Sequence, residues 1–186
     1  MEHYSRSIGE GFRSNLTGDY NRYNIAAAVE IGRYFGVADE RIGEAILSFS
    51  PDNNRSQAVK TERNLLVVDC YNANPSSMEV ALDNIATMEA EHKVLVLGDM
   101  LELGEWSEEA HINILRKADT IAERIILIGG EFAKAYEKSE GLLAKYDLYP
   151  TTAEALVALD NEPISGALVL LKGSRGIALE KLITEL

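Results

Sequence analysis

Residues 67–82 read VVDCYNANPSSMEVAL, and this stretch decides the fold because it joins two different hydrophobic patterns. An apolar run ends at Asp69, several polar residues follow, and a helical pattern begins near Ser76. Ser76 and Glu79 have the spacing of a capping box, in which a hydroxyl and a carboxylate satisfy the free amides of a helix start. The stretch is therefore predicted as the carboxyl end of a strand followed by a helix.

The same change of pattern recurs along the rest of the chain. Runs rich in Val, Ile and Leu occupy 64–69, 93–98, 124–129 and 167–172, and a weaker candidate strand occupies 145–149. The four strong runs lack in-out alternation, which is typical of parallel strands buried on both faces. Helical patterns lie at 76–90, 107–122, 130–138, 152–160 and 175–186, and Thr151 with Glu154 forms a second candidate capping box. This alternation predicts an α/β fold with a doubly wound, mostly parallel sheet.

Two helical patterns precede this region, at 20–35 and 39–49. Gly36 follows the first of them, as expected for a residue that ends a helix in a left-handed conformation. The segment 50–57, SPDNNRSQ, is rich in residues that favour loops. We place the domain boundary here, with a helical first part at 1–60 and an α/β domain at 61–186.

The composition excludes several classes of partner. The 186 residues carry a net charge of −12, whereas a nucleic-acid backbone or an anionic membrane requires clustered Lys and Arg. The chain has no signal-peptide pattern and no apolar run of the roughly 18 residues that a membrane span needs. The single cysteine, Cys70, excludes an internal disulfide and a cysteine-based zinc site, and we interpret it as a small buried residue. We therefore expect a cytoplasmic protein without nucleic-acid binding or membrane insertion.

The ends of the predicted strands indicate where a ligand binds. In an open parallel sheet, ligands bind beyond the carboxyl ends of the strands. These ends are predicted at 69–72, 98–100, 129–131 and 172–175, and three of the four carry groups that can bond or charge-pair with a ligand. The opposite ends are also polar, but they lack glycine and hydroxyl groups. This asymmetry predicts a polar ligand site at the carboxyl edge.

Each candidate residue at this edge also has a structural alternative. Asp69 can accept hydrogen bonds from the two hydroxyls of a ribose, or it can cap a helix or turn. Asn72 and Asn74 suit a neutral or zwitterionic ligand, but asparagine is also a common turn residue. Residues 172–175, Lys-Gly-Ser-Arg, open the last predicted helix, where free amides favour an anion. A tight turn with a surface lysine and arginine is the alternative.

Other polar residues are open to similar pairs of interpretations. Arg55 lies in the boundary loop, where an arginine can reach a phosphate or can remain solvated. Asp99 with Glu102 and Glu105 could bind a metal or an ammonium group, although a solvated acidic loop is the simpler interpretation. His111, on the following helix, is interpreted as structural.

Two nucleotide-binding signatures are absent from the sequence. No G-x-x-x-x-G-K-[ST] string occurs, and no G-x-G-x-x-G string opens the first strand–helix unit. No Ser/His/Asp or Cys/His set has the spacing of a known catalytic template. From the residues alone, the prediction is an α/β domain with a polar ligand site, joined to a helical segment.

A set of longer motifs resembles the Mur ligase family of ATP-dependent amide-forming ligases in peptidoglycan synthesis. These motifs are NLTGDYNRYNIAAA (15–28), NNRSQ (53–57), DCYNANPSSM (69–78) followed by LGDMLELGEWSEEAH (97–111), and LLKGSRGIALE (170–180). The YNANP and GDMLELG strings are similar to the branch that adds D-alanyl-D-alanine to a UDP-N-acetylmuramoyl-tripeptide. The resemblance implies that 1–60 is the end of a central ATPase domain and 61–186 is a Rossmann-like C-terminal domain.

The resemblance also implies roles for individual residues. Its ATP-binding residues would be Asn24 near the adenine, Arg55 at a phosphate and Asp69 at the ribose. Its substrate-binding residues would be Asn72 and Asn74 in the dipeptide pocket, Ser174 and Lys172 at a peptide carboxylate, and Arg175 with Asp99 near the same pocket. ATP and Mg²⁺ would be the cofactors of the full-length enzyme. No catalytic residue and no metal ligand is expected within this chain.

A phosphate-binding loop, a catalytic glutamate and a carbamylated lysine would all lie upstream of this chain in such a ligase. We therefore expect a fragment that is inactive alone, with oligomers formed through surfaces that truncation exposes. One alternative is a stand-alone α/β module that binds a ligand without catalysis. Another is a different ligase of the same superfamily, such as one that adds glutamate to folate, although the YNANP string argues against it.

Overall fold

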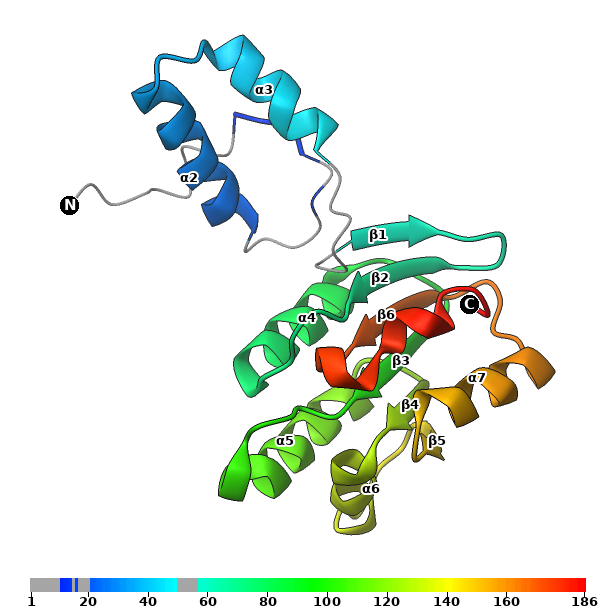
Figure 1. Cartoon of the computed structure of the whole chain (residues 1–186). Helices are drawn as coiled ribbons and strands as arrows, with labels where there is room; N and C mark the ends of the chain where they lie inside the picture. The colour runs from blue at the N-terminus through cyan, green and yellow to red at the C-terminus, as the bar shows by residue number, and fades with distance from the viewer. Residues whose placement is uncertain (1–10, 15, 17–20, 50–56) are drawn as a thin grey trace. The chain divides into compact units, whose positions relative to one another are not determined.

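The computed structural model describes residues 11–14, 16, 21–49 and 57–186, and Figure 1 shows its elements. The chain divides into two compact units, Met1–Asp52 and Asn53–Leu186. The division falls inside the loop where the sequence predicts a boundary. Among the described residues, no helix has both the length and the apolar character needed to cross a membrane.

The first unit contains two helices, α2 (Asn21–Tyr34) and α3 (Asp39–Ser48), as the sequence predicts. Ile25 and Val29 of α2 pack on Ile42 of α3, and Phe12, Leu16 and Ile46 border this small cluster. Gly36 has φ of 73° after α2, which confirms it as the residue that ends the helix.

The second unit is built on a six-stranded sheet in the order β1-β2-β6-β3-β4-β5. All neighbouring strands are parallel except β1 and β2, which pair antiparallel. This arrangement confirms the predicted fold class. The strands are β1 (Gln57–Lys60), β2 (Leu65–Asp69), β3 (Lys93–Gly98), β4 (Arg124–Ile128), β5 (Lys145–Tyr149) and β6 (Leu168–Lys172).

Strand β1 is absent from the sequence prediction, which assigns no strand to 57–60 and places these residues in the first domain. It is a short edge strand whose side chains alternate between half-buried and exposed positions, so it lacks the continuous apolar run of the other strands. Because β1 pairs with β2, it belongs to the second unit.

The helices of the second unit match the predicted ones except at the C-terminal end. They are α4 (Pro75–Thr87), α5 (Ser107–Asp119), α6 (Gly130–Glu137) and α7 (Thr152–Asn161), together with the 3₁₀ turn η1 (Gly104–Trp106). The helix predicted at 175–186 is wrong. Two 3₁₀ turns replace it, η2 (Arg175–Ile177) and η3 (Leu179–Leu182), separated by Ala178 with φ of 59°. The break lets Leu179 and Leu182 both pack under the sheet.

One of the two predicted helix caps is wrong. Asn74, rather than Ser76, is the N-cap of α4, and its side-chain oxygen accepts from the Ser77 amide at 2.9 Å. In return, the Ser77 hydroxyl oxygen accepts from the Asn74 amide at 3.1 Å. Pro75 at the first helical position explains the shift, because proline fits there and disfavours helical conformation in the residue before it. Thr151 caps α7 as predicted, accepting from the Glu154 amide at 3.3 Å. The Glu154 carboxylate accepts from the Thr151 hydroxyl at 3.0 Å, so only the Thr151 half of the predicted capping box is observed.

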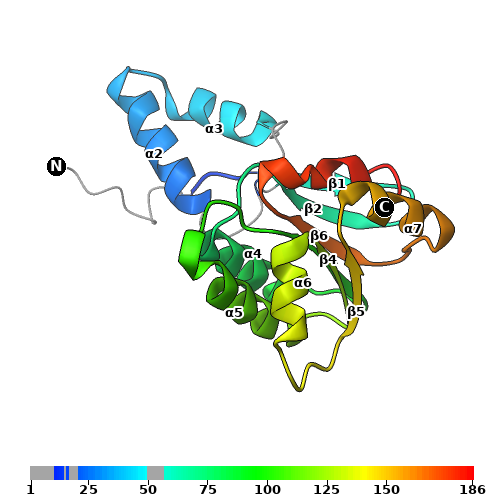
Figure 2. The ribbon, with the colours of Figure 1, turned by 60° about the horizontal axis from the view of Figure 1, so that its bottom comes forward.

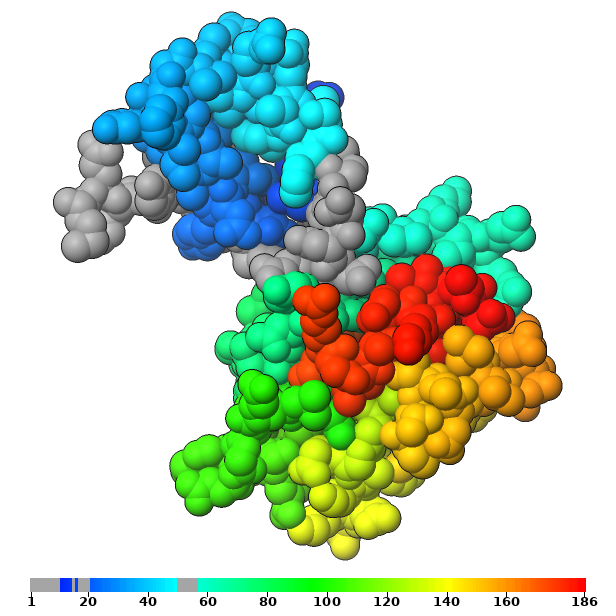
Figure 3. Space-filling view, in the orientation of Figure 1, coloured from blue at the N-terminus to red at the C-terminus, as the bar shows by residue number. Residues whose placement is uncertain are grey.

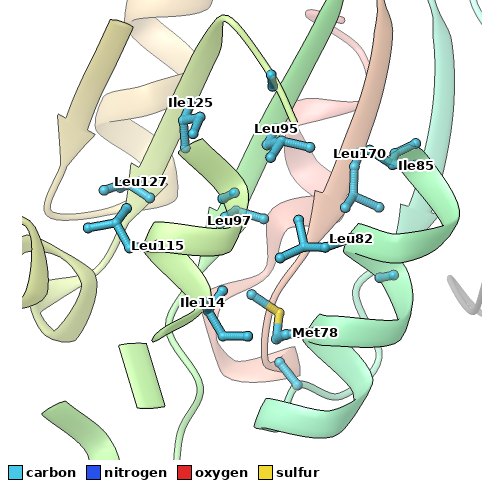
Figure 4. Close-up of a cluster of buried hydrophobic side chains, with 14 of the residues drawn as sticks. Met78, Leu82, Ile85, Leu95, Leu97, Ile114, Leu115, Ile125, Leu127 and Leu170 are labelled. Atoms are coloured by element: carbon cyan, nitrogen blue, oxygen red, sulfur yellow. The ribbon is translucent and has the colours of Figure 1, made fainter. Parts of the chain in front are cut away.

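The helices form one layer on each face of the sheet (Figures 1 and 2). Successive strand residues point to opposite faces, so each strand contributes to two hydrophobic clusters. Figure 4 shows the cluster under α4 and α5, which contains Met78, Leu82, Ile85, Leu95, Leu97, Ile114, Leu115, Ile125, Leu127 and Leu170. The other cluster joins α7 and η3 to the opposite face through Ala155, Leu159, Leu179 and Leu182.

The C-terminal residues are attached to the β1–β2 turn. The Thr61 hydroxyl donates to the Leu186 carbonyl at 2.9 Å, and the Arg63 guanidinium donates to the Glu185 carbonyl at 3.3 Å. Figure 3 shows these last residues, in red, against the teal β1 region. This attachment holds the segment after β6 on the α7 face.

Candidate functional site

The candidate site lies where the chain leaves β2, β6 and β3. The segments after β2 and β3 lead to α4 and α5 on one face, whereas the segment after β6 leads to η3 on the other face. Neighbouring segments therefore diverge on both sides of β6. Such a switch point is where open α/β sheets bind ligands, because the diverging segments leave space beyond the strand ends.

Asp69 and Lys172 form an ion pair at the end of β2 and β6. The two residues are register partners in the parallel pair, and the Lys172 Nζ lies 2.9 Å from Asp69 Oδ2. The Lys172 side chain is 2% exposed, whereas that of Asp69 is 18% exposed. The same ammonium donates to the Asn72 carbonyl at 2.6 Å. One buried charge thus connects the strand end to the segment that follows it.

Asn72 and Asn74 use their side chains differently in that segment. The Asn72 side-chain oxygen accepts from the Ala73 amide at 2.9 Å, and the residue is exposed. Asn74 is also exposed, but its side-chain oxygen caps α4 and accepts from the Ser76 hydroxyl at 2.9 Å. Both asparagines therefore make the turn contacts that were the structural alternative, and both residues are exposed.

Residues 173–175 form a close turn against the end of β3. A Cβ at Gly173 would lie 3.0 Å from Gly98 Cα, so glycine allows the two backbones to touch. The Ser174 amide donates to the Asp99 carbonyl at 3.2 Å, and the Ser174 hydroxyl oxygen accepts from the Leu101 amide at 2.9 Å. Because the Ser174 hydroxyl is the acceptor in this bond, its hydrogen can still donate to another group. Ser174 is thus a buried connection between two strand ends.

Arg175 is the exposed cation of this turn. Its guanidinium carbon lies 5.5 Å from the centroid of the Tyr71 ring, within the range of a cation–π contact. Tyr71 and Arg175 come from the segments after β2 and β6 and are both exposed. The contact connects the two segments on the solvent side, as Lys172 connects them inside.

Asp99 is buried and fully used by a helix start, so the predicted solvated acidic loop is wrong for this residue. Its Oδ2 accepts from the Glu131 amide and its Oδ1 from the Phe132 amide, both at 2.9 Å. Gly129 has φ of 118°, and a Cβ there would lie 2.2 Å from Asp99 Oδ2. The carboxylate occupies the positive end of α6, where an external anion could otherwise bind.

Glu102 and Glu105 are exposed and do not join Asp99. Within the part of the chain that the structure describes, no group of three or more His, Cys, Asp or Glu side chains could hold a metal ion. The metal interpretation of this loop therefore has no geometric support.

His111 is structural, as the sequence predicts. It is completely buried, and its Nε2 accepts from the Met100 amide at 3.0 Å. That bond assigns the proton to Nδ1, which donates to the Ser107 carbonyl at 2.7 Å. The ring also packs edge-on against Phe132, with 4.6 Å between the centroids. A neutral histidine thus holds the start of the loop after β3.

Cys70 is a buried residue, as the sequence predicts. Burial, together with the negative charges of Glu180 and Asp69, raises the pKa of its thiol to about 12. A thiol of this kind remains protonated and unreactive at neutral pH.

The two other predicted ATP-binding residues are Asn24 and Arg55. Asn24 belongs to the first unit, where it is exposed on α2 and its amide nitrogen donates to the Asn21 side chain at 2.9 Å. Arg55 lies outside the described residues. The structure therefore brings together Asp69, Asn72, Asn74, Lys172, Ser174 and Arg175 at one edge of the sheet.

Sequence reasoning missed the pairing of Asp69 with Lys172 and the contact of Tyr71 with Arg175. Both strand ends are visible in the sequence, but neither pairing can be derived without knowing that β6 lies next to β2. The last residue of each predicted strand is the signal that could have found the pair, because residues at matching ends of adjacent parallel strands share a face.

Comparison with known proteins gives consistent results. The family model "Mur ligase, glutamate ligase domain" matches residues 54–175. The UDP-N-acetylmuramoyl-tripeptide–D-alanyl-D-alanine ligase of Treponema pallidum is 36% identical over 179 residues, which cover 94% of this chain and 38% of that protein. The ligase of the same name from Bacillus subtilis is 32% identical and is matched over 97% of this chain and 41% of its own length.

A solved structure shows the same similarity in three dimensions. A crystal structure of MurF from Acinetobacter baumannii superposes with a TM-score of 0.82 at 30% identity, covering 94% of this chain and 39% of that one. The chain thus spans only about two fifths of the length of these similar proteins, 38% and 41% of the two curated relatives.

Proposed function

Because this chain belongs to the Mur ligase family, we propose that it forms the C-terminal part of an ATP-dependent ligase that adds D-alanyl-D-alanine to a UDP-N-acetylmuramoyl-tripeptide. The two curated relatives that carry this enzyme name match nearly the whole chain. The observation that supports this proposal most directly is that four residues lie together at the switch point of the sheet: Asp69, Asn72, Ser174 and Arg175. These residues lie in the motifs that carry the family resemblance.

The proposed reaction has two steps. The terminal phosphoryl group of ATP moves to the carboxylate of the tripeptide, which forms an acyl phosphate and releases ADP. The amine of D-alanyl-D-alanine then attacks the acyl carbon, loses a proton and displaces phosphate, which leaves a new amide bond. We assign no catalytic group to this chain, and its contribution is to hold the nucleotide and the incoming dipeptide in place.

The chemistry of the site fits a nucleotide ribose at Asp69. Lys172 contacts Oδ2, which leaves Oδ1 of the partly exposed carboxylate to accept from a ribose hydroxyl. We propose Asn24 and Arg55 as the residues of the first unit and the boundary loop that bind the adenine and a phosphate. We assign magnesium to no residue of this chain, because both oxygens of Asp99 already accept amide bonds.

The dipeptide is zwitterionic, and the neighbouring residues offer matching groups. Arg175 presents an exposed cation for its carboxylate, and the Ser174 hydroxyl hydrogen is a neutral donor beside it. Asn72 and Asn74 present amide groups that can bind its peptide bond. We propose that the reaction takes place in the cytoplasm, where such precursors are assembled.

Titration of the isotope-labelled chain with D-alanyl-D-alanine, followed through its amide NMR signals, tests the dipeptide site. We expect shifts concentrated at 71–74 and 173–175, and much smaller shifts with L-alanyl-L-alanine at the same concentration. Arg175→Ala should remove most of the response, whereas Arg116→Ala, an exposed arginine on α5, should leave it unchanged. Equal responses to the two stereoisomers would contradict the proposed substrate.

An activity assay tests the assignment of catalysis to other parts of the enzyme. The purified 186-residue chain should give no turnover with ATP, the tripeptide precursor and D-alanyl-D-alanine. Formation of product by this chain alone would show that it contains the catalytic groups that we place elsewhere.

A further inference from the structure

We propose that Lys172 is a positioning residue that orients the Asp69 carboxylate and the Asn72 backbone for the ligand without contacting the ligand itself. The inference deepens the proposed function and rests on its assignment of Asp69 to the ribose. It changes the expected role of Lys172, which the family resemblance places at a peptide carboxylate.

The direction of the Lys172 side chain follows from its place in the sheet. Leu168 and Leu170 of β6 belong to the cluster under α4 and α5, so Lys172, two residues further, points to the same face. Asp69 lies on that face for the same reason, because Val67 belongs to the same cluster. Parallel register then sets the two end residues side by side, at the top of an apolar layer.

A buried ammonium at this place needs close partners, because an unpaired charge in a low-dielectric environment is very costly. Lys172 obtains them from Asp69 Oδ2 at 2.9 Å and the Asn72 carbonyl at 2.6 Å. These two acceptors use two of the three ammonium N–H donors, so a ligand carboxylate could bind only through the third. With a side chain only 2% exposed, Lys172 offers almost no surface for such a contact.

The two bonds have a direct consequence for the candidate site. The bond to Oδ2 fixes the rotation of the Asp69 carboxylate and directs Oδ1 away from the lysine. The bond to the Asn72 carbonyl fixes the segment that begins at Cys70 and ends at the Asn74 cap. A single charge therefore sets both the ribose-binding atom and the backbone of the predicted dipeptide segment, while exposed Arg175 remains the cation for a ligand.

The test compares ATP with 2′,3′-dideoxy-ATP, whose sugar cannot donate to Asp69. Dissociation constants are measured by NMR titration of the full chain and of its Lys172→Met variant, with Lys181→Met, an exposed lysine on η3, as the matched control. The unaltered chain and the control should bind ATP about tenfold more tightly than the dideoxy analogue, the usual value of a charged hydrogen bond. Lys172→Met should abolish this preference while leaving the affinity for the dideoxy analogue unchanged, and Lys172→Arg should restore part of it.

Other outcomes would overturn the inference in distinguishable ways. An equal loss of affinity for both nucleotides in Lys172→Met would mean that Lys172 contacts the ligand directly. An unchanged preference would mean that Lys172 does not orient Asp69. Should Lys172→Met fail to fold, Lys172→Gln, which keeps a donor without the charge, replaces it in the same comparison.

A second measurement separates this inference from the proposed function. Hydrogen exchange of the Ala73 amide, which bonds the Asn72 side chain, should accelerate at least about tenfold in Lys172→Met relative to the Lys181→Met control. If the unaltered chain shows no preference for ATP, the ribose assignment fails, and the exchange rate alone decides whether Lys172 positions the segment. An unchanged exchange rate would overturn that part too.

Discussion

Asp69 ends β2 and Asp99 directly follows β3, on the two sides of β6, yet their carboxylates have different partners. Asp69 shares one oxygen with the ammonium of Lys172, and its side chain is 18% exposed. Asp99 accepts a backbone amide on each oxygen at the start of α6, and its side chain is 6% exposed. The first carboxylate keeps an oxygen for a ligand, and the second does not.

The difference shows why residue type and strand end together do not identify a binding residue. The amides at a helix start attract any anion, and in α6 the chain's own Asp99 occupies that place. At the start of α4 the cap is Asn74, so Asp69 is not needed for that role. An acidic residue at a strand end is thus available to a ligand only where other groups satisfy the helix starts that lie near it.

The largest effect should come from Gly129→Ala, which disrupts the contact between Asp99 and the start of α6. Gly129 has φ of 118°, and the added Cβ would lie 2.2 Å from Asp99 Oδ2. Backbone strain and the displaced carboxylate together should lower the free energy of unfolding by about 3 kcal/mol or more in urea titrations. The neighbouring Gly130→Ala is the control, because its Cβ meets open space, and it should raise stability by about 0.5 kcal/mol. Similar values for the two variants would disprove the described packing.

Asp99→Ala should have the next largest effect, because it leaves the Glu131 and Phe132 amides without their acceptor. We expect a loss of about 2 kcal/mol, and about half of that for Asp99→Asn, which keeps one oxygen. Exposed Glu102→Gln should stay within about 0.5 kcal/mol of the unaltered chain. If Asp99→Ala weakened dipeptide binding without loss of stability, Asp99 would be a ligand-binding residue after all.

Much of the fold can be predicted because strands buried on both faces leave continuous apolar runs. Runs such as 93–98 and 124–129 therefore identify β3 and β4 almost to the residue. Strand β1 escapes because its pattern is weak and polar, and the final helix is over-predicted because nothing in 175–186 announces the left-handed backbone at Ala178. Local pattern does not determine these features, which depend on tertiary contacts.

The candidate site can be predicted only to the level of the strand ends. Asp69 and Lys172 are both visible as end residues, but their contact depends on β6 inserting between β2 and β3. The role of Asp99 likewise depends on a positive φ at Gly129, which belongs to the following strand–helix unit. Sequence order says which residues reach the edge, and strand order says which of them meet.

Asn74 is both the cap of α4 and a predicted ligand-binding residue, and Asn74→Ala tests its role as the cap. Loss of the bond from the Ser77 amide should cost about 1 kcal/mol of unfolding free energy. Glu79→Gln, at the position of the cap partner predicted from the sequence, should change stability by less than about 0.5 kcal/mol. If Asn74→Asp keeps stability but loses the response to D-alanyl-D-alanine, the side chain has both roles. Equal costs for Asn74→Ala and Glu79→Gln would contradict the observed cap.

The smallest effect is a pH dependence at Asp119, which like Asp99 is a carboxylate held by backbone amides. Burial acts to raise the pKa of this carboxyl, but the Ala144 and Leu143 amides and the Tyr146 hydroxyl outweigh it and lower the pKa below its usual range. A carboxylate with a lowered folded pKa stabilises the protein above its unfolded pKa, and this contribution disappears as the pH falls through the folded pKa.

Asp119→Asn should therefore lower the free energy of unfolding by about 1 kcal/mol at pH 7, and the deficit should shrink below about pH 4. Urea titrations at pH 7, 5 and 3 measure this difference, with exposed Asp160→Asn on α7 as the control. If the stability difference between Asp119→Asn and the unaltered chain stayed constant down to pH 3, the amides would not be stabilising the ionised form of Asp119. Carboxylates satisfied by amides would then not form the single class to which Asp99 and Asp119 are assigned, and the contrast with Asp69 would need another cause.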